Sequence, residues 1–168
     1  MGILGNTLAA AAATVMLAGS ANATCWSDVA YKAAQVRELD TMMMVEALRC
    51  RKTAANFVHD YNNFVVASRP ALLKANADLR SHFSDSVGQK GALNAYDNYM
   101  TTVANRYGAG TEGLACEDMA SIARAALATN GSADALYQIA VAANMVPSIA
   151  GERCGAEPLA PITIAARP

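Results

Sequence analysis

Apolar side chains recur through most of the chain at steps of three and four residues, the spacing that places them on one face of an α-helix. One such stripe is Val36, Leu39, Met43 and Ala47. No run of alternating apolar and polar residues is long enough to indicate a strand. The segments with the helical pattern are about 27–49, 53–67, 69–86, 91–107, 112–129 and 133–146. The sequence therefore predicts an all-α protein, a small helical bundle of five to six helices.

Residues at the ends of these segments support the assignment. Ser27 and Ser132 are suited to cap a helix N-terminus, because a serine hydroxyl can accept a bond from a backbone N–H of the first turn. Pro70 suits the first turn of the third segment, and Pro147 is expected to stop the last one. The three prolines beyond it predict an extended tail from about residue 148, lying over the bundle.

The first 23 residues have the pattern of a cleaved secretory signal. An apolar run covers residues 8–18, and Ala21-Asn22-Ala23 offers small residues at the two positions read by a signal peptidase. The run is shorter than the roughly 20 residues of a membrane span. The segment before it has no Lys or Arg, so retention as an uncleaved anchor is the alternative. We expect a signal peptide over 1–23 and one mature domain over 24–168, secreted or periplasmic.

All four cysteines, Cys25, Cys50, Cys116 and Cys154, lie in the predicted mature part, and an even number in an exported chain indicates disulfide bonds. A helix over 27–49 is roughly 35 Å long. Bridged Cα atoms lie within about 7 Å, so Cys25 cannot pair with Cys50. The preferred pairing is Cys50–Cys116 across a helix contact with Cys25–Cys154 joining the ends. The crossed pairing, Cys25–Cys116 with Cys50–Cys154, stays open.

Composition and charge exclude some partners. The net charge is −1 and the isoelectric point is about 6.1, which gives no indication of nucleic acid or an anionic membrane as a partner. The run Gly108 to Gly113 reads G-x-G-x-x-G, but the dinucleotide motif follows a strand. Here the preceding residues have helical periodicity. We interpret the run as a helix end and a link, and we predict no cofactor.

Metal, haem and catalytic chemistry have weak support. Met42-Met43-Met44 contains thioethers that copper could use, but successive residues of a helix point in different directions, so we interpret them as core residues. His59 and His82 lie on separate predicted helices and are expected at the surface or at helix ends. The chain lacks C-x-x-C-H, H-E-x-x-H and G-x-S-x-G. We assign no metal ligand and no catalytic residue.

Four polar aromatic and amide residues are candidates for a ligand or partner cleft. Tyr61 and Asn62 belong to the second predicted helix, and Tyr96 and Tyr99 to the fourth. They could line a cleft between the two helices, or they could be half-buried packing positions.

The chain resembles uncharacterised exported helical proteins of alphaproteobacteria. The resemblance rests on Val36-Arg37-Glu38-Leu39, Leu48-Arg49-Cys50-Arg51, Asp60-Tyr61-Asn62 and Asn105-Arg106-Tyr107-Gly108. It implies export and a helical fold, and it supplies no activity. The sequence thus predicts an exported structural or interaction protein. The alternatives are a helical carrier of a small apolar ligand, which predicts a closed apolar pocket, and an enzyme or a metal or haem binder of unrecognised type.

Overall fold

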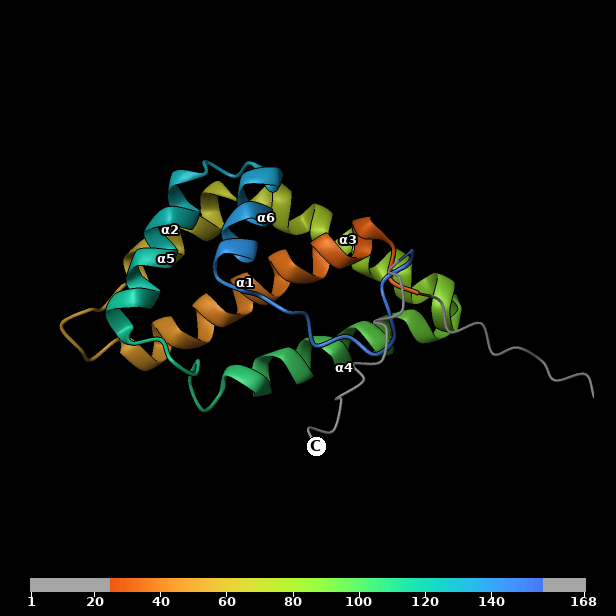
Figure 1. Cartoon of the computed structure of the whole chain (residues 1–168), viewed down its shortest axis with the longest axis horizontal. Coiled ribbons are helices and arrows are strands. Elements are labelled where there is room, and N and C mark those ends of the chain that lie inside the picture. The colour runs from red at the N-terminus through yellow and green to blue at the C-terminus, as the bar shows by residue number, and fades with distance from the viewer. Residues whose placement is uncertain (1–24, 156–168) are drawn as a thin grey trace, which may run out of the picture.

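The computed structural model describes residues 25–155, which form six helices and no strand (Figure 1). The expected all-α fold is confirmed. The predicted signal segment 1–23 and the last part of the predicted tail lie outside the described residues. The helices are α1 (Asp28–Cys50), α2 (Val58–Ala67), α3 (Arg69–Val87), α4 (Gln89–Tyr107), α5 (Cys116–Ala128) and α6 (Ala133–Ala142).

Helix α1 is the centre of the molecule and contacts each of the other five helices. It crosses the bundle as the orange ribbon of Figure 1, while α3 pairs with α4 and α2 pairs with α5 around it. Fourteen of its 23 residues are buried, among them five polar residues. The buried polar side chains of this helix are removed from water, so they need partners inside the protein.

The core is built from large apolar side chains contributed by every part of the bundle. Leu39, Met42 and Met43 of α1 are almost completely buried, whereas Met44 is 39% exposed. This agrees with the interpretation of the methionine run as mainly core filling. Their neighbours in the core include Phe57, Phe64, Leu79, Val103, Met119 and Leu136.

Both disulfides form with the preferred pairing. Cys50 at the end of α1 is bonded to Cys116 at the start of α5, with a Cα–Cα distance of 5.7 Å. Cys25 is bonded to Cys154, with 4.9 Å between the Cα atoms. Next to this second bridge, Trp26 and Arg153 pair as an isolated parallel β-bridge. The two ends of the described chain are therefore joined by a covalent bond and by backbone hydrogen bonds.

Three predicted helix limits were wrong, each because of local hydrogen bonding or backbone conformation. The second helix begins at Val58 rather than about 53, because the Asn56 side chain accepts the Val58 N–H and holds a turn there. The fifth begins at Cys116 rather than about 112, since Gly113 has a φ of +76°. The last ends at Ala142, before the expected stop at Pro147, because Asn144 adopts a φ of +53°.

No helix within residues 25–155 is both long and apolar enough to cross a membrane.

The Cys50–Cys116 disulfide should contribute strongly to stability. It closes a loop with a sequence separation of 66 residues, for which chain entropy predicts a contribution of about 4 kcal/mol. We expect the double variant Cys50→Ala/Cys116→Ala to lower the free energy of unfolding in urea by about 2–4 kcal/mol. A loss of a few tenths of a kcal/mol would contradict this view of the bridge.

Candidate functional site

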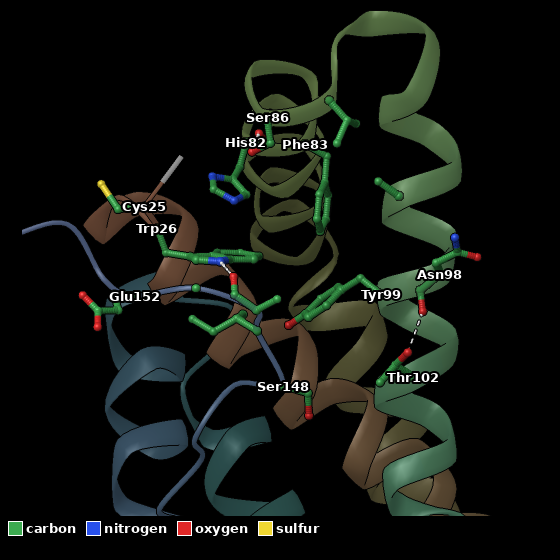
Figure 2. A pocket seen from close by; sticks show the side chains of 15 residues that line it. Cys25, Trp26, His82, Phe83, Ser86, Asn98, Tyr99, Thr102, Ser148 and Glu152 are labelled. Carbon is green, nitrogen blue, oxygen red and sulfur yellow. Dashed lines mark hydrogen bonds between the residues drawn. The ribbon is translucent and has the colours of Figure 1, made fainter. Parts of the chain in front are cut away.

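A groove of about 760 Å³ opens between α3, α4 and residues 148–152, a segment that we name the strap (Figure 2). The strap follows α6 and runs toward Cys154, so the groove is bounded by parts of the chain that are far apart in sequence. Trp26 contributes the indole, and further side chains come from the two helices, from Cys25 and from the strap. The lining residues are Cys25, Trp26, His82, Phe83, Ser86, Val87, Ala95, Asn98, Tyr99, Thr102 and the strap, Ser148 to Glu152. We name this site the Trp26 groove.

Four rings form a continuous aromatic cluster along one wall of the Trp26 groove. The ring centroids of Trp26 and His82 are 4.0 Å apart, with an interplanar angle of 31°. Phe83 meets Trp26 edge-on at 5.8 Å and lies 5.8 Å from Tyr99. Aromatic pairs in such tilted and edge-to-face arrangements attract each other beyond the burial of their area. The cluster is therefore a fixed surface rather than a set of independent side chains.

The strap is attached to Trp26 by the backbone and by the indole. The indole N–H of Trp26 donates to the Ala150 carbonyl at 2.9 Å. The Trp26 backbone N–H donates to the Glu152 carbonyl at 2.8 Å, and the Cys154 N–H donates to the Trp26 carbonyl at 2.9 Å. Trp26 is only 3% exposed, so these bonds are shielded from water. They fix one end of the strap relative to the aromatic cluster.

The other end of the strap is held by Glu38, a fully buried residue of α1. Its Oε1 accepts the Tyr99 hydroxyl at 3.0 Å and the backbone N–H of Ser148. Its Oε2 accepts Arg106 Nη1 at 3.4 Å and the Tyr107 hydroxyl at 3.5 Å. One carboxylate thus connects α1, α4 and the strap beneath the groove.

Burial dominates the electrostatics around this carboxylate. Removal from water raises the pKa of Glu38, although its hydrogen bonds to Ser148 and Tyr99 and the charge of Arg106 act in the opposite direction. Burial and the neighbouring carboxylate also raise the pKa of Tyr99, and they raise the pKa of Tyr107 to about 12. Both tyrosines therefore remain protonated donors at neutral pH.

Other buried polar groups of α1 hold further segments in the same manner. Gln35 Nε2 donates to the Met145 carbonyl at 2.9 Å, just before the strap. The Tyr61 hydroxyl of α2 donates to Asp40 at 3.2 Å, and burial raises the pKa of Asp40. Glu46 accepts the backbone N–H of Thr111 at 2.6 Å. Helix α1 therefore positions α2, the α4–α5 link and the start of the strap through side-chain hydrogen bonds.

His82 is the titratable ring of the Trp26 groove. Its imidazole is half-buried, and burial lowers its pKa, an effect that the charge of Asp85 partly offsets. The hydroxyl of Ser86 donates to the main-chain carbonyl of His82 at 2.8 Å. Burial thus favours the neutral imidazole, in which one nitrogen can donate and the other can accept.

The other residues and motifs that the sequence offered as candidates for chemistry lie outside the Trp26 groove. His59 is exposed on α2 and contacts the Asn63 side chain at 3.1 Å. Among residues 25–155, no three His, Cys, Asp or Glu side chains are grouped so that they could hold a metal ion. The G-x-G-x-x-G run follows helix α4 and forms the link to α5, where Gly110 has a φ of +106°. This agrees with our interpretation of the run as a helix end and a link.

The four predicted cleft residues are not brought together in the Trp26 groove. Tyr99 lines the groove. Tyr61 instead bonds to Asp40, and Asn62 is exposed on α2. The Tyr96 hydroxyl donates to Asn76 at 2.7 Å and joins α4 to α3.

Sequence reasoning missed Trp26, Phe83 and the strap as parts of one site. One signal was present, because Trp26 is adjacent to Cys25, and the preferred Cys25–Cys154 bridge would bring residues 148–153 close to it. The stacking of His82 on Trp26 had no such signal, since it depends on the crossing of α3 past the N-terminal end of α1.

Comparison with family models, characterised proteins and solved structures gave no match. The assignment of the site therefore depends on its geometry.

Replacement of Glu38 should destabilise the fold and loosen the strap. In Glu38→Gln, one carboxylate oxygen becomes an NH₂ group. This group cannot accept a hydrogen bond, and it would face two hydrogen-bond donors. We expect the free energy of unfolding to fall by about 1–3 kcal/mol, the usual effect of leaving buried donors unsatisfied. Urea unfolding followed by Trp26 fluorescence measures this.

The matched control is Glu112→Gln, which changes an exposed glutamate of the α4–α5 link and should shift the unfolding free energy by less than about 0.5 kcal/mol. Equal effects of the two substitutions would show that Glu38 is not a structural centre.

Proposed function

We propose that this chain is an exported, non-catalytic binding protein that holds a small apolar ligand in the Trp26 groove. The observation that carries the proposal is the groove itself, about 760 Å³ and lined largely by aromatic and aliphatic side chains. It is open on one side, whereas a closed pocket was expected of a carrier. Ligand sites in proteins are typically hollows of about 300–1,000 Å³ with mostly apolar walls and a few polar groups.

The two disulfides support export. Disulfides persist in secreted and periplasmic proteins and are rare in a reducing cytosol. Both bridges of this chain are compatible with an oxidising compartment outside the cytoplasm. The apolar run and the Ala21-Asn22-Ala23 site of the sequence favour secretion or transfer to the periplasm.

The hydroxyl groups around the groove favour binding over nucleophilic catalysis. The Tyr99 hydroxyl donates to Glu38. Those of Thr102 and Ser86 donate to main-chain carbonyls one turn earlier in their own helices. A catalytic serine would instead donate to a general base. These groups support the walls of the groove.

A protein partner is the competing proposal, and mass measurement separates it from a small ligand. We expect a native mass spectrum of the protein from its own host to show a chain beginning at Thr24, four hydrogens lighter than the reduced form. Extra mass of a few hundred daltons should be present and should leave on denaturation. In Ala95→Phe, which fills the groove from α4, this extra mass should be lost.

The control variant is Ala125→Phe, at an exposed alanine of α5, which should keep the extra mass. A bare monomer or a complex with another protein would contradict the small-ligand proposal. A chain that begins at Met1 with reduced thiols would contradict export.

A further inference from the structure

The chemistry of the Trp26 groove also indicates which class of ligand it takes, an inference that rests on the proposed function. We propose that the ligand is a neutral planar aromatic molecule carrying a hydroxyl or a similar polar group, with its ring against the aromatic cluster and its polar group on the imidazole of His82.

The rings of the groove favour an aromatic ligand over an aliphatic one of equal size. Trp26, His82, Phe83 and Tyr99 are linked by centroid distances of 4.0–6.1 Å. Figure 2 shows the rings of Trp26, Phe83 and Tyr99 grouped in the space between α3, α4 and the strap. A further ring can add edge-to-face or offset contacts to such a cluster. Contacts of this kind correspond to roughly a two- to ten-fold gain in affinity.

Among the four rings of the groove, His82 is the one with hydrogen-bonding capacity that residues 25–155 do not use. The Trp26 indole N–H is committed to Ala150, and the Tyr99 hydroxyl is committed to Glu38. Within residues 25–155, by contrast, neither imidazole nitrogen of His82 forms a hydrogen bond, and its ring contacts are with Trp26 and Phe83. A half-buried polar group gains most from a partner that a ligand brings.

The charges near His82 disfavour an anion. Asp78 and Asp85 line a separate hollow on which His82 also borders. Glu152 is on the groove rim, with its carboxylate directed away from the rings (Figure 2). Arg153 does not line the groove, and its guanidinium pairs with Asp28 at 2.8 Å. Arg106 Nη1 bonds to Ser148, Val146 and Glu38. A neutral ligand therefore fits better than a carboxylate.

Three related compounds separate the ring contribution from the hydrogen bond. They are 1-naphthol, naphthalene, which lacks the hydroxyl, and decahydro-1-naphthol, which lacks the aromatic ring. Isothermal titration calorimetry on the full mature protein should show 1-naphthol binding more tightly than either of the others. The expected ratio is roughly two- to ten-fold in each comparison.

The variant His82→Phe keeps a ring against Trp26 and removes both nitrogens. This variant should bind 1-naphthol with roughly two- to ten-fold lower affinity, because the hydroxyl of 1-naphthol loses its hydrogen-bond partner. Its affinity for naphthalene, which has no hydroxyl, should be unchanged. The control variant His59→Phe changes the exposed histidine of α2 and should alter neither affinity. Should His82→Phe fail to fold, the comparison of the three compounds on the wild-type protein still decides the question.

Two results would overturn this inference while the small-ligand proposal stands. One is equal affinity of the wild-type protein for 1-naphthol and decahydro-1-naphthol. The other is an equal loss of affinity for 1-naphthol and for naphthalene in His82→Phe. Binding of none of the three compounds would also overturn it. In that case the native mass spectrum decides the small-ligand proposal independently.

Discussion

The structure depends on one constraint, which is that helix α1 is enclosed by the rest of the bundle and yet carries polar side chains. A buried carboxylate is unfavourable unless donors surround it. Glu38 meets this requirement with four donors, from Tyr99, Tyr107, Arg106 and the backbone of Ser148. Each donor belongs to α4 or to the strap, so satisfying one charge also fixes the positions of two segments.

The Trp26 groove is a consequence of that arrangement. Its strap is held by Glu38 at the Ser148 end and by Trp26 and the Cys25–Cys154 bridge at the other end. Between these attachments the strap lines one side of the groove, and the aromatic cluster lines another. A bundle of this size thus keeps an open hollow because the segment that bounds it is fixed at both ends. Pre-formed walls of this kind reduce the conformational entropy that the protein must lose when a ligand binds.

The amino-acid pattern was sufficient for the fold but not for the site. Helical periodicity led to the correct fold class, because it depends on local spacing. The reach of a 23-residue helix excluded only Cys25–Cys50, and the crossed pairing stayed open beside the preferred one that the structure has. The buried role of Glu38 could not be predicted, since a glutamate next to Arg37 in a helix normally faces solvent. Tyr61 and Tyr99 were expected in one cleft, but each hydroxyl is directed to a different carboxylate of α1. Such pairings depend on how the helices cross, which periodicity does not determine.

A nitrogen–proton NMR spectrum of the protein titrated with 1-naphthol tests directly whether the Trp26 groove binds a ligand. Trp26 is the single tryptophan of the chain, so its indole N–H gives one resonance, and that group bonds to the strap at Ala150. We expect this resonance and the amide resonances of residues 149–152 to shift together, while those of α2 and α5 stay in place. Shifts confined to α2 or α5, or no shift of the indole resonance at saturating ligand, would contradict binding in the Trp26 groove.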